Sequence, residues 1–174
     1  MERRNFLQQS ALAGAGILAG SAFNRAEAQE KNDALPQNGK PFNLNYGFHD
    51  GMFRNSAGND FLDQIKFGYD QGFRSIEDNG MMSRTPEMQK KIGDLLAKLG
   101  MTMGVFVITS DNWHWSKTLT TGKQEWIDKM EKDCRQAVEV AKRCNAKYMT
   151  VVPGNFDRSL PIEYQTANVI NALR

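Results

Sequence analysis

Four successive units, each with a short extended segment followed by a helical pattern, make up most of this chain. The extended segments are residues 43–48, 74–76, 102–109 and 147–152, and polar residues or Gly and Pro separate each from its helix. Strands that alternate with helices pair in parallel, because a right-handed crossover through a helix joins consecutive parallel strands. The pattern predicts an α/β fold. The fourth helical pattern reaches Arg174 without a C-cap, so we expect the units to be part of a larger barrel.

The helical segments have clear end signals. Residues 86–99 follow Thr85 as N-cap, begin with Pro86 and stop at Gly100. A shorter helix is predicted at about residues 60–71 and a longer one at about residues 123–145. A fourth helix begins near Pro161. The apolar stripe of the longest helix comprises Trp126, Ile127, Met130, Cys134, Ala137, Val138 and Ala141. Lys129, Lys132 and Lys142 are expected to face water on its other side.

Residues 1–28 have the pattern of an export signal. A twin-arginine motif, Arg3-Arg4-Asn5-Phe6-Leu7, precedes an apolar stretch over residues 11–23 and a small-x-small cleavage pattern at residues 26–28. A membrane anchor is the alternative, but about 13 residues at roughly 1.5 Å each cannot cross a hydrocarbon core of about 30 Å. We therefore expect a Tat signal peptide at 1–28, a polar linker at 29–41 and a barrel domain at 42–174. The Tat translocon would export the protein to the periplasm or beyond without a stable membrane anchor, with retention of an uncleaved leader as the alternative.

Charge and cysteine content exclude several classes of function. The chain has 22 Lys and Arg against 20 Asp and Glu, and part of the basic excess lies in the leader, so no charged surface for nucleic acid is predicted. Cys134 and Cys144 would lie about 15 Å apart along one helix, which is too far for a disulfide. Their spacing is not that of a zinc or redox motif, so both are predicted to be small core residues.

Candidate functional residues follow the predicted strands, because catalytic groups of parallel α/β folds collect at the carboxyl ends of strands. His49 is one of two histidines in the chain and stands beside Asp50; the alternative is a hydrogen-bonded histidine that only caps a strand end. Glu77 ends the second strand, where a buried carboxylate is costly unless it is paired. We therefore predict that both residues contact a substrate.

Further candidates follow the second and third strands. Trp113 and His114 lie in the loop after residues 102–109, where an aromatic wall could contact a sugar, although surface packing is an alternative for Trp113 and Trp115. Asp78 and Asn79 precede Gly80 and are interpreted as turn-forming residues, since their side chains bond local backbone groups.

Five segments together resemble the exported branch of the hydroxypyruvate isomerase family. They are residues 45–53, 76–82, 99–107, 119–124 and 149–154, and the likeness extends over residues 42–174 and the leader. Proteins of this family are sugar isomerases and epimerases with the xylose isomerase-like TIM barrel. The resemblance implies that the chain holds about four βα units, the amino-terminal half of a (β/α)8 barrel.

The resemblance also implies a mechanism. Such enzymes hold a divalent metal ion, Mg, Mn or Zn, with residues of the fifth to eighth strands, and two glutamates there move a proton between adjacent carbons through an enediolate. Those strands would follow Arg174, so no catalytic residue and no metal ligand is expected within residues 1–174. The chain would instead supply substrate-binding residues, namely His49, Glu77, Trp113 and His114, and would be inactive alone. Val152 stands where some relatives have a histidine, so the fourth strand is not expected to contact the metal.

Three functional hypotheses follow. The first is an exported, metal-dependent isomerase that acts on a small sugar or keto acid. The second is a metal-dependent phosphodiesterase of the endonuclease branch, which the near-neutral charge and predicted export disfavour. The third is a non-catalytic half-barrel that self-associates through its open strand edges, giving a homo-oligomer.

Overall fold

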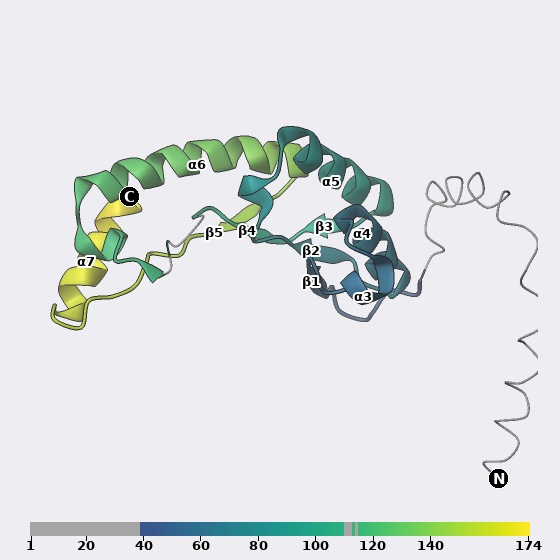
Figure 1. The fold of residues 1–174 in the computed structure, drawn as a ribbon, viewed down its shortest axis with the longest axis horizontal. Helices are drawn as coiled ribbons and strands as arrows, with labels where there is room; N and C mark the ends of the chain where they lie inside the picture. Colours follow the sequence, from purple (N-terminus) through teal and green to yellow (C-terminus); the bar gives the residue numbers. More distant parts are fainter. Residues whose placement is uncertain (1–38, 110–112, 114) are drawn as a thin grey trace, which may run out of the picture. The chain divides into compact units, whose positions relative to one another are not determined.

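The structure is a computed structural model that describes residues 39–109, 113 and 115–174. The predicted signal peptide, residues 29–38 of the predicted linker and His114 lie outside the described residues. The described part belongs to one compact unit, Pro36–Arg174. Its elements alternate as predicted, and the expectation of an α/β fold with parallel strands is confirmed (Figure 1). Along the chain they are β1 (Gly47–His49), α3 (Arg54–Ala57), α4 (Phe61–Asp70), β2 (Ser75–Glu77), α5 (Pro86–Leu99), β3 (Thr102–Met103), β4 (Val105–Val107), α6 (Gln124–Cys144), β5 (Tyr148–Thr150) and α7 (Ile162–Ala172).

The strands form two parallel ladders in chain order, β1-β2-β3 and β4-β5. The extended segment predicted at residues 102–109 is divided at Gly104 into β3 and β4. Backbone hydrogen bonds nevertheless join β2 to both halves: Gly104 donates to the Ile76 carbonyl at 2.8 Å, and Asp78 donates to the Val105 carbonyl at 3.2 Å. The strands therefore follow one another side by side in chain order.

The predicted helix ends are confirmed. Thr85 caps α5 by accepting a hydrogen bond from the Met88 amide at 3.2 Å, and Gly100 ends the helix in the left-handed conformation with φ of 65°. Asp60 caps α4 in the same way through the Leu62 amide at 2.7 Å. Asn145 ends α6 with φ of 55°.

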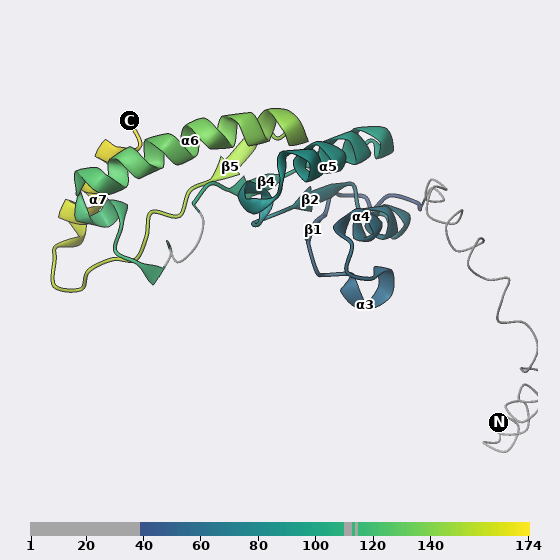
Figure 2. The same ribbon diagram turned by 45° about the horizontal axis from the view of Figure 1, so that its top comes forward.

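One face of the strands is packed against helices. The central residues Phe48, Ile76 and Phe106 are fully buried, whereas their neighbours Gly47 and His49 are exposed. Since successive strand residues point to opposite faces, the helices cover one face of the strands and leave the other accessible. Figure 2 shows α5 and α6 on the same side of the strands, as in the view of Figure 1.

The buried face of α6 differs from the predicted stripe, and it includes Asp133, which the prediction left out. Val138 is 45 % exposed, and Val140 is buried in its place, together with Met130 and Ala137. The reason is geometric, because spacings of three and seven from Ala137 reach Val140 and Cys144 but not the adjacent Val138. Cys134 and Cys144 are free thiols packed in or against the core, as predicted. Burial raises the pKa of both thiols.

Within the part of the chain that the structure describes, no helix is both long and apolar enough to cross a bilayer.

Candidate functional site

His49 and Glu77 form a pair at the carboxyl ends of β1 and β2. They are direct neighbours in the parallel register, and His49 Nε2 lies 3.2 Å from Glu77 Oε2. Their side chains are 53 % and 42 % exposed, on the face of the strands that the helices leave open. Glu77 is not buried as the sequence argument supposed, so burial does not require a partner for it, although His49 lies beside it. Both side chains are accessible to a small molecule.

An imidazole beside a carboxylate can take part in proton transfer. The Glu77 carboxylate contacts the His49 ring at Nε2, and among the described residues Nδ1 makes no hydrogen bond. A substrate hydroxyl or carbonyl oxygen within hydrogen-bond reach of either side chain could exchange a proton with it. The pair therefore has the chemistry of general acid and base groups as well as of polar substrate contacts.

Beside this pair, Arg84 joins the loops that follow β1 and β2. Its Nη2 donates to Asp50 Oδ2 at 2.7 Å, and its Nε donates to Asp78 Oδ2. The guanidinium also stacks over the Phe61 ring, 4.8 Å from its centroid. Burial alone would lower the pKa of Arg84, but the hydrogen bonds that it donates to Asp78 and Asp50 outweigh burial and raise that pKa above its ordinary value. Arg84 thus stays charged and fixes both loops.

Asp78 has the turn role that the sequence predicted and a second role that it did not. Its Oδ1 accepts a hydrogen bond from the Gly80 amide at 3.0 Å, which closes the predicted turn. Its other oxygen binds Arg84, and the residue is only 2 % exposed. Sequence reasoning missed Arg84 because Asp50 lies 34 residues away and no local pattern links the two.

The loops also border an open pocket of about 530 Å³. Asp50, Ser83, Arg84 and Met88 are among the residues that line it. Because Asp50 follows His49 directly and Asp78 follows Glu77, the pocket and the histidine–glutamate pair belong to the same end of the strands.

Trp113 lies elsewhere. The side chain is 4 % exposed and packs edge-on against Trp126 of α6, with ring centroids 5.3 Å apart. Lys129 lies 5.1 Å from the Trp113 ring and binds Asp133 at 2.6 Å, so this lysine, expected to face water, is half-buried. The structure brings His49 and Glu77 together but places Trp113 in the core, and His114 is outside the described residues. Trp115, the other aromatic residue of this loop, is 73 % exposed.

A metal site is not complete among the described residues. No three His, Cys, Asp or Glu side chains within residues 39–109, 113 and 115–174 converge so that they could hold a metal ion. His49 and Glu77 provide two potential ligands, while Asp50 and Asp78 are already bound by Arg84. The resemblance places the metal ligands after Arg174, so the described residues do not test the metal centre that it implies.

No model of a protein family matches this chain, and no curated protein matches it. The likeness to the hydroxypyruvate isomerase family is therefore an expectation from the sequence alone.

Proposed function

We propose that this chain belongs to an isomerase that interconverts small hydroxy-carbonyl compounds, of the hydroxypyruvate isomerase or sugar isomerase/epimerase type. The observation that carries the proposal is the His49–Glu77 pair, accessible at the carboxyl ends of adjacent parallel strands. Such an isomerisation moves protons between neighbouring carbon and oxygen atoms, and a histidine–carboxylate pair can bind those oxygens and carry a proton. The consecutive order of the parallel strands agrees with part of a (β/α)8 barrel of the xylose isomerase type.

In this proposal His49 and Glu77 contact hydroxyl or carbonyl oxygens of the substrate. Arg84 shapes the neighbouring wall by holding Asp50 and Asp78 in place. The resemblance implies a divalent metal that would polarise the substrate carbonyl. Because the described residues do not form its site, no step is assigned to a metal here.

The test is an isomerisation assay on the protein as its gene encodes it, including any in-frame sequence after codon 174. Hydroxypyruvate and a panel of ketoses serve as substrates, and metal content is measured on the same preparation. Turnover of at least one compound is the expected result. A stop at codon 174 together with no turnover of any compound would reject the isomerase and favour a non-catalytic half-barrel.

We also propose export through the Tat pathway, which rests on the leader sequence. Replacing Arg3 and Arg4 together by Lys is expected to hold the precursor in the cytoplasm of a Tat-competent host, because the receptor reads the twin arginines. Fractionation and immunoblotting measure the distribution. Arg25→Lys is the matched control and should be exported normally. Unchanged export of the double-Lys precursor would contradict the proposed localisation.

Self-association is the second candidate, favoured by the uncovered face of the strands. Tyr148 of β5 is 70 % exposed, and Leu44 and Tyr46 in the segment before β1 are 65 % and 51 % exposed, whereas parallel sheets are normally covered on both faces. Residues 29–174 alone are therefore expected to self-associate or aggregate at micromolar concentration. Sedimentation velocity at several concentrations measures this. A monomer at every concentration, with a sharp thermal transition, would contradict the prediction.

A further inference from the structure

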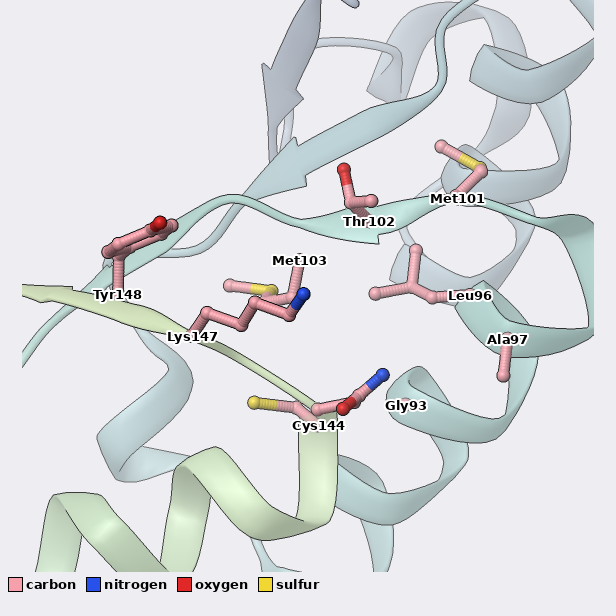
Figure 3. A pocket seen from close by; sticks show the side chains of 10 residues that line it. Gly93, Leu96, Ala97, Met101, Thr102, Met103, Cys144, Lys147 and Tyr148 are labelled. Carbon is pink, nitrogen blue, oxygen red and sulfur yellow. The ribbon is translucent and has the colours of Figure 1, made fainter.

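A second pocket lies at the opposite end of the strands from His49 and Glu77. It is about 300 Å³ in volume and is bordered by the amino ends of β3 and β5 and by the last turns of α5 and α6. Its walls include Leu96, Met101, Met103, Cys144, Lys147 and Tyr148 (Figure 3). The pocket is mainly apolar, and Lys147 brings a cation to it.

The break at Gly104 explains why the pocket is open. β5 pairs only with β4, beginning at Val105 and Tyr148, while Thr102 and Met103 pair with β2 on their other side. The amino half of the divided strand therefore has no partner on the side of β5. α5 and α6 are in close contact at Gly93, which lines the pocket, since a Cβ there would lie 2.3 Å from the Arg143 carbonyl oxygen. The crevice is thus part of the backbone arrangement.

Lys147 is free to bind a ligand. Figure 3 shows its side chain extending into the pocket toward Met103 and Leu96. Within the part of the chain that the structure describes, the Lys147 ammonium makes no hydrogen bond or ion pair.

Capping of the adjacent helix ends does not occupy Lys147 either. The Met101 amide donates to the Leu96 carbonyl at 2.8 Å, and the Ala146 amide donates to the Ala141 carbonyl at 3.0 Å. These backbone bonds satisfy carbonyls of the last turns without help from a lysine. Lys147 is exposed at the edge of this mainly apolar pocket, and among the described residues no side chain or backbone group is bonded to its ammonium.

We propose that this pocket binds a small amphipathic monocarboxylate. A cavity of about 150 Å³ holds benzene, so a pocket twice that size accepts on the order of ten to twelve non-hydrogen atoms. The carboxylate would accept charge-assisted hydrogen bonds from Lys147, and the hydrocarbon part would lie against Leu96, Met101 and Met103. This binding site is independent of the proposed isomerase function, because it shares no residue with the end of the strands that carries His49 and Glu77.

Isothermal titration of the full chain with octanoate and with octan-1-ol tests the proposal. Octanoate is expected to bind with one site per chain and about tenfold more tightly than octan-1-ol, since only the carboxylate pairs with Lys147. Lys147→Met should lower octanoate affinity about tenfold and leave octan-1-ol binding unchanged. Lys132→Met, on the exposed side of α6, is the control and should bind octanoate normally. No octanoate binding, or equal binding of both probes, would overturn the proposal.

Two further measurements keep the test independent of folding. Lys147→Arg retains the charge and should bind octanoate. This variant tests the role of the charge if Lys147→Met does not fold. Octanoate should also slow alkylation of Cys144, which lines the pocket, but not of Cys134, which does not. Equal alkylation of Cys144 with and without octanoate would reject this pocket as the site. If a second copy of the chain occupied this pocket instead, the protein would be a dimer that binds no octanoate, and this result would also overturn the proposal.

Discussion

Replacing Arg84 by Met is expected to lower the free energy of unfolding by about 3 kcal/mol or more, because it leaves a buried carboxylate without its cation. Asp78 is 2 % exposed and depends on Arg84 for one of its two oxygens. Methionine keeps an unbranched apolar chain against Phe61, so the lost charge dominates the change. Urea denaturation followed by circular dichroism measures the difference.

An exposed ion pair provides the matched control. Arg135 and Glu131 lie one turn apart on α6, with side chains 77 % and 63 % exposed, so Arg135→Met should change the free energy of unfolding much less than Arg84→Met. Adding Asp78→Asn to Arg84→Met should restore part of the stability, because the amide oxygen can still accept the hydrogen bond of Gly80 while the buried charge is removed. Equal, small effects of Arg84→Met and Arg135→Met would show that the cluster does not stabilise the fold.

The helix boundaries could be predicted because their causes are local. Thr85 and Gly100 lie directly at the two ends of α5, and each acts on backbone groups a few residues away. The alternation of strands and helices is likewise a pattern within short windows of sequence. These parts of the prediction required no knowledge of the tertiary structure.

The features that were missed depend on contacts between distant segments. The division of residues 102–109 depends on Gly104, whose Cβ would lie 3.0 Å from the Ile76 carbonyl oxygen of the neighbouring strand. Trp113 could line a pocket or fill the core, and only its packing on Trp126 decides between the two. The contacts of Arg84 with its two carboxylate partners form only in the folded loops, and no spacing along the chain predicts them.

The histidine–glutamate pair lies between these cases. Strand order placed His49 and Glu77 at the same end of the sheet, but their contact depends on the register of β1 and β2. A slip of one residue would move Glu77 out of line with His49 and turn its side chain to the opposite face. The sequence therefore predicted the neighbourhood of the pair, while its 3.2 Å contact comes from the structure.

Glu77→Gln and His49→Asn are each expected to lower isomerase turnover on the order of a hundredfold, if the proposed function holds. Each variant keeps a polar side chain but removes a group that can transfer a proton or position the substrate. Metal content should not change, because the metal ligands that the resemblance implies lie beyond residue 174. Turnover and metal stoichiometry are measured together on the protein as its gene encodes it.

Asp94→Asn, on the exposed side of α5 and paired only with Lys90, is the matched carboxylate control and should leave turnover unchanged. The two readouts separate the possible roles of the pair. Full activity of both variants would show that the contact between His49 and Glu77 has only a structural role, joining the ends of two strands. Stoichiometric loss of metal in either variant would show that this pair supplies a metal ligand, which contradicts a role confined to the substrate. A hundredfold loss of turnover with normal metal content requires that the pair act on the substrate, since the control carboxylate tests for a general effect of lost charge.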